Sequence, residues 1–280
     1  MKSRGRRETD VNRAAETAVS WADAQGWNPG LDDAERFLYA DPQSFLAAEL
    51  EGEIVATVSC VLYGDSYAFI GFFIVRSGLR GRGIGSPLFD RALARAGGRS
   101  VGLDGVPEQQ AYYERRGFVP AHRNVRWRTT GGGARPDGPI ELSSVPFEAL
   151  LAFDSAVFGS ERERFLRAWV ERPPGHALAW LDRGCLAGYG VLRPCRVGAK
   201  IGPLFAHDEE VAAALMRGLL AAAGPGTDVF IDMPATNPRT SALRAELPME
   251  ASFETVRMYR NGRPPEDAHR VLGVTTFEFG

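Results

Sequence analysis

An arginine- and glycine-rich segment, Arg80–Ser86 (Arg-Gly-Arg-Gly-Ile-Gly-Ser), follows an apolar stretch ending at Val75 and precedes a helical pattern over Pro87–Ala96. A turn from strand to helix directs the unpaired N–H groups and the positive dipole end of the helix toward one point. Glycines let the backbone approach an anion without a Cβ atom between them, and Arg80 and Arg82 add positive charge. The segment therefore predicts a phosphate-binding loop.

The glycine spacing narrows the choice of ligand. A Walker loop needs a lysine that this segment lacks, and a dinucleotide fingerprint needs a third glycine where Ser86 stands. The pattern Arg80-x-x-Gly83-x-Gly85 resembles the loop with which GNAT-superfamily N-acetyltransferases bind the pyrophosphate of acetyl-CoA. A turn that binds no ligand is the alternative. The resemblance implies acetyl-CoA contacts from Arg80, Gly81, Arg82, Gly83, Ile84, Gly85 and Ser86.

A second segment, Ala111–Phe118 (Ala-Tyr-Tyr-Glu-Arg-Arg-Gly-Phe), resembles the superfamily segment whose tyrosine lies near the CoA sulfur. The resemblance implies that Tyr113 is the general acid for the leaving thiolate. The alternative for the two tyrosines is an aromatic pair, one buried and one on the surface, and we assign such a packing role to Tyr112. In GNAT folds the strand before the loop separates from its neighbour. By that resemblance, the backbone of Phe73, Ile74 and Val75 pairs with the pantetheine arm, and one of their N–H groups faces the oxyanion.

The general base is harder to assign. An alkyl amine with a pKa near ~10 arrives protonated and must lose a proton before it attacks. Many relatives use a strand glutamate, but Ala68–Val75 contains no acid. Asp104, just past a strand predicted over Ser100–Leu103, is the candidate for catalysis or amine binding. An ordinary Asp-Gly turn, or a water chain to a more distant acid, is equally compatible with the sequence.

The acceptor pocket of GNAT enzymes is formed partly by the loop between the first helices. The segment Trp27-Asn28-Pro29-Gly30 occupies that position, so Trp27 and Asn28 are expected to bind the acceptor. The alternative is a Pro-Gly turn with Trp27 anchored in the core. The wider resemblance is to a bacterial two-domain GNAT subgroup, and it rests on Trp27–Gly30, Gly71–Val75, Leu103–Val106, Gln109-Gln110, Ile201–Leu204 and Gly273–Glu278.

The chain divides at Thr129–Pro139, where three consecutive glycines and two prolines exclude a helix or a central strand. We expect a catalytic GNAT domain over residues 1–130, a linker over 131–139, and a degenerate GNAT-like domain over 140–280. The predicted fold is α/β (α+β), with a mixed central sheet flanked by helices in each domain. In the second half, the acids Asp208, Glu209 and Glu210 follow the strand Ala199–Phe205 and would repel a pyrophosphate.

Composition excludes several other classes of protein. The 280 residues carry 33 basic and 35 acidic side chains, so the basic excess of a nucleic-acid-binding protein is missing. The sequence contains no uninterrupted run of ~18 apolar residues, so no membrane span is predicted. Three cysteines without a Cys-x-x-Cys spacing suggest a reducing, cytoplasmic location, and four scattered histidines indicate no metal site.

We therefore expect a cytoplasmic, acetyl-CoA-dependent N-acyltransferase that acetylates the amine of a small molecule, because the second domain would restrict access by a folded protein. Two alternatives remain open. One is acetylation of lysine side chains or N-termini of proteins or peptides. The other is a non-catalytic acyl-CoA-binding sensor, which would keep Arg80–Ser86 without a usable acid and base.

Overall fold

A computed structural model describes residues 10–171 and 175–280. The helices are α1 Val11–Ala24, α2 Asp33–Ala40, α3 Gly85–Ala96, α4 Gln110–Glu114, α5 Phe147–Phe158, α6 Glu163–Val170, α7 Glu209–Ala223 and α8 Arg239–Glu246. The strands are β1 Phe45–Leu50, β2 Glu53–Tyr63, β3 Tyr67–Val75, β4 Ser100–Gly105, β5 Val119–Thr130, β6 Ile140–Glu141, β7 His176–Asp182, β8 Cys185–Pro194, β9 Ala199–Ala206, β10 Asp228–Pro234, β11 Glu250–Arg260 and β12 Val271–Gly273.

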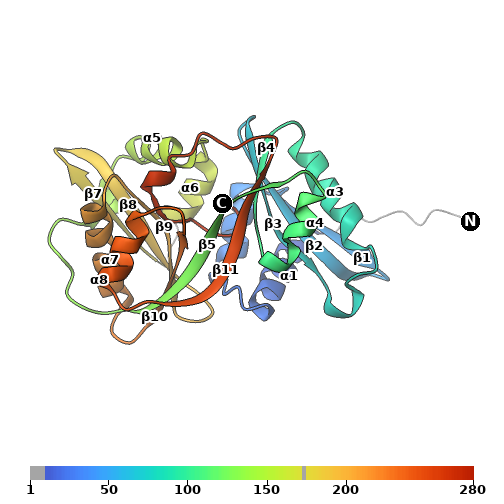
Figure 1. The fold of residues 1–280 in the computed structure, drawn as a ribbon, viewed down its shortest axis with the longest axis horizontal. Coiled ribbons are helices and arrows are strands. Elements are labelled where there is room, and N and C mark those ends of the chain that lie inside the picture. The colour runs from blue at the N-terminus through green and yellow to red at the C-terminus, as the bar shows by residue number, and fades with distance from the viewer. Residues whose placement is uncertain (1–9, 172–174) are drawn as a thin grey trace, which may run out of the picture.

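The predicted mixed α/β class is confirmed, but the strands form one sheet. Its twelve strands run in the order β1-β2-β3-β4-β11-β5-β10-β9-β8-β7-β6, with β12 paired to β9. Strands β1 to β4 and helices α1, α3 and α4 lie on one side of the molecule, and α5 to α8 with β7 to β10 lie on the other (Figure 1). Strands β5 and β11 run side by side between them (Figure 1).

The two halves exchange strands at this centre, which the sequence did not predict. Strand β11, from the second half, lies between β4 and β5 and pairs with both of them. Strand β5, from the first half, pairs on its other edge with β10 of the second half. Residues 131–139 connect β5 to β6 and form neither helix nor strand. Each half therefore completes the sheet of the other.

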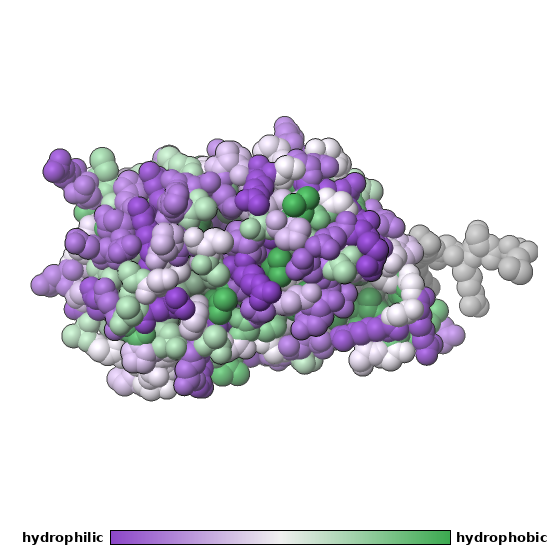
Figure 2. Space-filling model, viewed as in Figure 1, coloured by the Kyte–Doolittle hydropathy of each residue, from purple (hydrophilic) through white to green (hydrophobic). Residues whose placement is uncertain are grey.

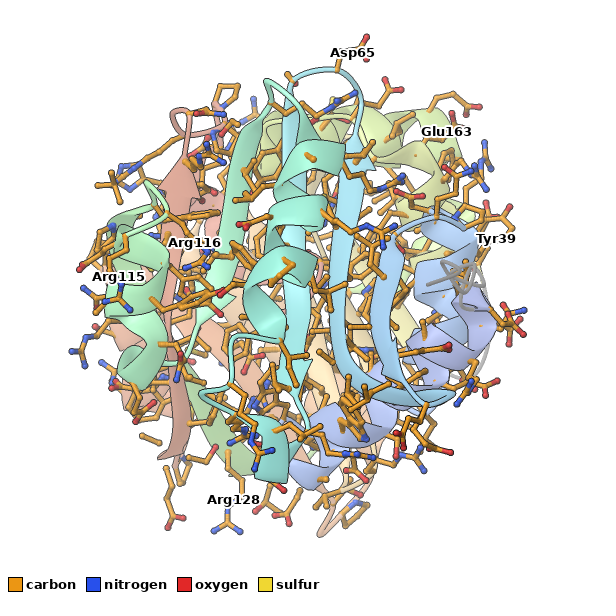
Figure 3. All side chains as sticks on the ribbon, turned by 90° about the vertical axis from the view of Figure 1, so that its right-hand side faces the viewer. Tyr39, Asp65, Arg115, Arg116, Arg128 and Glu163 are labelled. Atoms are coloured by element: carbon orange, nitrogen blue, oxygen red, sulfur yellow. The ribbon has the colours of Figure 1, made fainter. Side chains whose placement is uncertain are left out.

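Side chains that alternate along β2 explain why helices pack on both faces of the sheet in the first half. Val61 faces a cluster that includes Ala15 and Ala18 of α1, whereas Cys60 faces a cluster that includes Leu88 of α3. Successive residues of a strand point to opposite faces, so one apolar strand supports a helix on each side. Figure 3 shows α3 lying across the strands of this half.

The final segment of the chain returns to the first half. Residues 271–280 are all buried. The Phe279 ring stacks on Phe37 of α2 at 4.0 Å between centroids, and the Tyr63 hydroxyl donates a 2.6 Å hydrogen bond to the Phe279 carbonyl. Two segments of the second half, β11 and this tail, are thus part of the first half's core.

The surface is mostly hydrophilic on the face shown in Figure 2, where hydrophobic residues lie in small separate groups. Within residues 10–171 and 175–280, no helix is both long and apolar enough to cross a membrane.

The strand exchange predicts that a fragment of residues 1–131 does not fold alone. Without β11, the facing edges of β4 and β5 lose their hydrogen bonds. Each buried group left unpaired costs about 1–3 kcal/mol, against a total stability of about 5–15 kcal/mol. Circular dichroism should show no cooperative unfolding for this fragment, and co-expression with residues 132–280 should restore it. A monomeric first half that melts cooperatively would contradict the exchange.

Candidate active site

A separation between two neighbouring strands opens the site. Strands β3 and β4 pair in parallel from Tyr67 opposite Ser100 to Ile70 opposite Leu103, and no further. Strand β3 continues to Val75, so residues 71–75 have no strand partner on the β4 side. The expected separation of strands is therefore present, and it leaves Phe73, Ile74 and Val75 without a neighbouring strand on that side.

Strand β3 is also distorted where it leaves β4. Its register with β2 shifts between Thr57 and Ser59, and Phe72 takes a φ of 49°, in the left-handed region that few non-glycine residues adopt. The Thr57 hydroxyl donates a 3.0 Å hydrogen bond to the Phe72 carbonyl and stabilises this bulge. Bulges re-aim a strand, and they are common beside active sites.

A cavity of about 600 Å³ occupies this opening. Most of the residues predicted from the sequence line it, and Arg82 and Asn28 do not. The predicted residues on its wall are Trp27, Phe73, Ile74, Val75, Arg80, Gly81, Gly83, Ile84, Gly85, Ser86, Asp104 and Tyr113.

The loop before α3 has the backbone that an anion site needs. Gly81 and Gly83 have φ angles of 75° and 77°, and a Cβ atom at either would meet nothing within 4 Å. At Gly85, a Cβ atom would lie 2.8 Å from Phe73 Cζ, so glycine allows the start of α3 to pack against β3. Arg80 donates hydrogen bonds to the Val75 carbonyl and to Gln25. Free helix N–H groups and an arginine thus meet at the cavity, which fits the pyrophosphate of an acyl-CoA.

Tyr113 lies on α4 with its ring among Phe89, Tyr112 and Phe118. Gly105 makes room for it, since a Cβ atom there would lie 2.6 Å from Tyr113 Cε2. Burial raises the pKa of the Tyr113 phenol. The hydroxyl therefore stays protonated at neutral pH.

Tyr112 also lines the cavity, and its contacts are those of a packing residue. Its ring stacks on Phe73 at 5.6 Å, and the Arg116 guanidinium lies over it at 3.8 Å. Figure 3 shows Arg116 between α4 and α3. The Tyr112 hydroxyl is buried close to the Ser86 side chain of the loop.

Asp104 reaches the cavity wall, but its carboxylate is occupied. Oδ1 accepts from Asn124 at 2.8 Å and from Arg257 Nε at 3.0 Å, and Oδ2 accepts from Arg257 Nη2 at 2.6 Å. Burial raises the pKa of this carboxyl, and the Arg257 guanidinium opposes the effect. These contacts join β4 to β11, and a proton could be taken up only by weakening them.

Trp27 and Asn28 differ in their positions. Trp27 lines the cavity, and its carbonyl accepts hydrogen bonds from Arg126 at 2.6 Å and from Lys200 at 3.3 Å. The Asn28 amide exchanges two 2.9 Å hydrogen bonds with the Val197 backbone, one in each direction. Asn28 therefore fixes the loop to the second half of the chain.

The second half contributes wall residues that the sequence reasoning missed. They are Phe253 and Thr255 of β11, with Phe277 and Glu278 of the final segment. The buried Arg126 guanidinium lies 5.5 Å from the Phe253 ring and 5.0 Å from the Phe277 ring. The string Gly273–Glu278 belonged to the resemblance, but nothing local in the sequence placed it at the first half's site.

Glu278 is the second carboxylate on the wall. It is only 2% exposed. Oε2 accepts from the Thr276 hydroxyl, and Oε1 has no hydrogen-bond partner among the described residues. Burial raises the pKa of this carboxyl. No group of three or more His, Cys, Asp or Glu side chains suited to a metal ion occurs in the part of the chain that the structure describes.

Comparison with solved structures supports this architecture. A putative acetyltransferase from Pyrococcus horikoshii superposes with a TM-score of 0.84 at 22% identity, covering 100% of this chain and 99% of its own. A tandem GNAT protein from the clavulanic acid biosynthesis pathway gives a TM-score of 0.59 at 18% identity, covering 90% of this chain and 97% of its own. At these identities the likeness shows the fold.

Sequence comparison identifies the family. Residues 12–118 match the model of the acetyltransferase (GNAT) family, and residues 150–273 match that of an acetyltransferase (GNAT) domain. The holothin acyltransferase of Pseudoalteromonas sp. (strain SANK 73390) is 32% identical over 93% of this chain and 89% of its own length. The uncharacterized N-acetyltransferase YitH of Bacillus subtilis (strain 168) is 24% identical over 87% of this chain and 88% of its own. The chain belongs to the GNAT acetyltransferase family and contains two GNAT domains in tandem, as the Arg80–Ser86 loop, the Ala111–Phe118 segment and the division at Thr129–Pro139 led us to expect.

Proposed function

We propose that this GNAT acyltransferase transfers the acetyl group of acetyl-CoA to the amine of a small molecule. The observation that carries the proposal is the cavity, in which the unpaired backbone of β3, the glycine loop and Tyr113 share one wall. The Pseudoalteromonas relative is named for acylation of a single compound, holothin, and so gives a precedent for this use of a similar chain.

The first half supplies the acetyl-CoA site. The loop around Gly81 and Gly83 would hold the pyrophosphate, and Phe73, Ile74 and Val75 would pair with the pantetheine arm as an added strand would. A backbone N–H group facing the thioester oxygen stabilises the charge that develops there, with an effect of about 3–4 kcal/mol in comparable sites. Tyr113 would donate its proton to the departing sulfur.

Both halves form the acceptor end of the cavity. Trp27 comes from the first half, and Phe253 and Phe277 come from the second. Three aromatic rings favour an acceptor with an apolar or aromatic body. Since β11 and the final segment close this end, a small amine fits better than a lysine on a folded protein.

An amine screen tests the acceptor class. With acetyl-CoA and wild-type protein, thiol release should be at least about tenfold faster in kcat/KM for benzylamine, phenethylamine or aniline than for a lysine-containing peptide, because each aromatic contact contributes about 1 kcal/mol. Faster acetylation of the peptide would contradict the small-molecule assignment. Binding of acetyl-CoA without release for any amine would instead indicate a sensor.

Substitution in the loop tests the acetyl-CoA site. Gly83→Asp should lower acetyl-CoA affinity at least about a hundredfold, because it adds a carboxylate beside the pyrophosphate, where like charges repel. Gly64→Asp is the matched control, since Gly64 also has a positive φ, of 56°, and open space around it, but it is not on the cavity wall. Calorimetric titration should give one site per chain in the wild type and the control. Equal affinity in all three proteins would place the cofactor elsewhere.

The general acid is tested with the adjacent tyrosine as control. Tyr113→Phe should lower kcat by about 10²–10⁴-fold, the usual contribution of a positioned proton donor, and should leave acetyl-CoA affinity almost unchanged. Tyr112→Phe keeps the ring that packs between Phe73 and Arg116 and should change kcat little. If the two variants show the reverse order in steady-state thiol release, Tyr112 is the acid.

A further inference from the structure

We propose that Glu278, supplied by the second half of the chain, is the general base that deprotonates the acceptor amine bound in the first half's site. This inference rests on the proposed function, because it assigns a role within that reaction.

The two carboxylates on the cavity wall differ in what their oxygens can still accept. Asp104 accepts three hydrogen bonds from Asn124 and Arg257, on both of its oxygens. Glu278 accepts from the Thr276 hydroxyl on Oε2 alone, and Oε1 has no partner in the described structure. A base must have a free lone pair within reach of the proton, directly or through one water. Glu278 Oε1 offers such a lone pair on a residue of the cavity wall, and its use breaks no ion pair.

The backbone of Glu278 lies where the reaction would occur. A Cβ atom at Gly71 would overlap the Glu278 carbonyl group, so the two residues are in direct contact. Gly71 is the first residue of β3 beyond the last pair with β4 at Ile70. The segment carrying Glu278 therefore packs onto β3 at the start of the opening, beside the backbone assigned to the thioester.

Charged groups from several elements surround this carboxyl. Burial raises its pKa, Lys200 of β9 and Arg126 of β5 lower it, and Asp33 of α2 raises it further. Arg193 of β8 also interacts with it. The cations oppose the cost of burying a carboxylate, and the net upward shift makes Glu278 a stronger base than an exposed glutamate. A base whose pKa lies nearer the working pH is more effective.

The proton balance of the step is complete. Glu278 accepts one proton from the ammonium group, and the neutral nitrogen attacks the thioester carbonyl to form the C–N bond. The C–S bond then breaks, and CoA leaves as a thiol with the proton of Tyr113. The nitrogen then loses its second proton, which passes through water to the Tyr113 phenolate and restores the hydroxyl. Glu278 releases its proton to solvent.

The variant Glu278→Gln, which keeps the shape of the side chain, tests this role. With benzylamine, which is protonated at pH 7, kcat should fall by about 10²–10⁴-fold. With aniline, which is already neutral at pH 7, kcat should change less than about threefold.

The pH profile gives a second test. Wild-type kcat with benzylamine should fall as the pH drops through the Glu278 pKa. The variant should instead gain activity as the pH rises toward the pKa of the amine.

Two further variants separate catalysis from folding. Glu254→Gln makes the same chemical change on β11, where Glu254 forms a surface ion pair with Arg123 of β5, and should behave as wild type. Glu278→Asp should recover part of the lost activity with benzylamine. Acetyl-CoA affinity, measured by calorimetry, should be the same in all of these proteins.

Equal losses with benzylamine and aniline, or an unchanged pH profile in Glu278→Gln, would overturn the base assignment while the acyltransferase function stands. If the wild-type protein binds acetyl-CoA but acetylates neither amine nor any other in the screen, the proposed function fails, and the base assignment fails with it.

Discussion

The insertion of β11 between β4 and β5 is the constraint on which the rest of the structure depends. The buried contact between Asp104 and Arg257 fixes it, with N–O distances of 3.0 and 2.6 Å. Removing one member of such a pair leaves an uncompensated buried charge, which typically costs about 3–5 kcal/mol. The same insertion brings Phe253 and Thr255 to the cavity. The join between the two halves and one wall of the cavity are therefore the same structural element.

Much of the site could be predicted because its information is local. The Arg80–Ser86 loop takes its conformation from closely spaced glycines between a strand and a helix, and Tyr113 follows from one short segment. The cap of α7 is equally local, because Asp208 accepts from the Val211 N–H group of the helix that it begins.

The features that could not be predicted depend on contacts between residues far apart in the chain. Asp104 looks like half of an Asp-Gly turn, and its partner Arg257 comes 153 residues later. Asn28 occupies the expected loop, but Val197 determines its orientation. Phe253, Phe277 and Glu278 reach the cavity only because β11 and the final segment cross into the first half. No spacing within the sequence encodes that crossing.

Strand exchange also affects how the chain folds during synthesis. When β4 and β5 leave the ribosome, the strand that will lie between them begins at residue 250 and has not yet been made. Two strand edges, and the core surface around Phe37 later covered by Phe279, stay open until β11 and residues 271–280 have emerged. Long-range pairing of this kind slows folding and exposes apolar surface to other chains. Because segments of both halves line one cavity, the first half depends on residues that are translated much later.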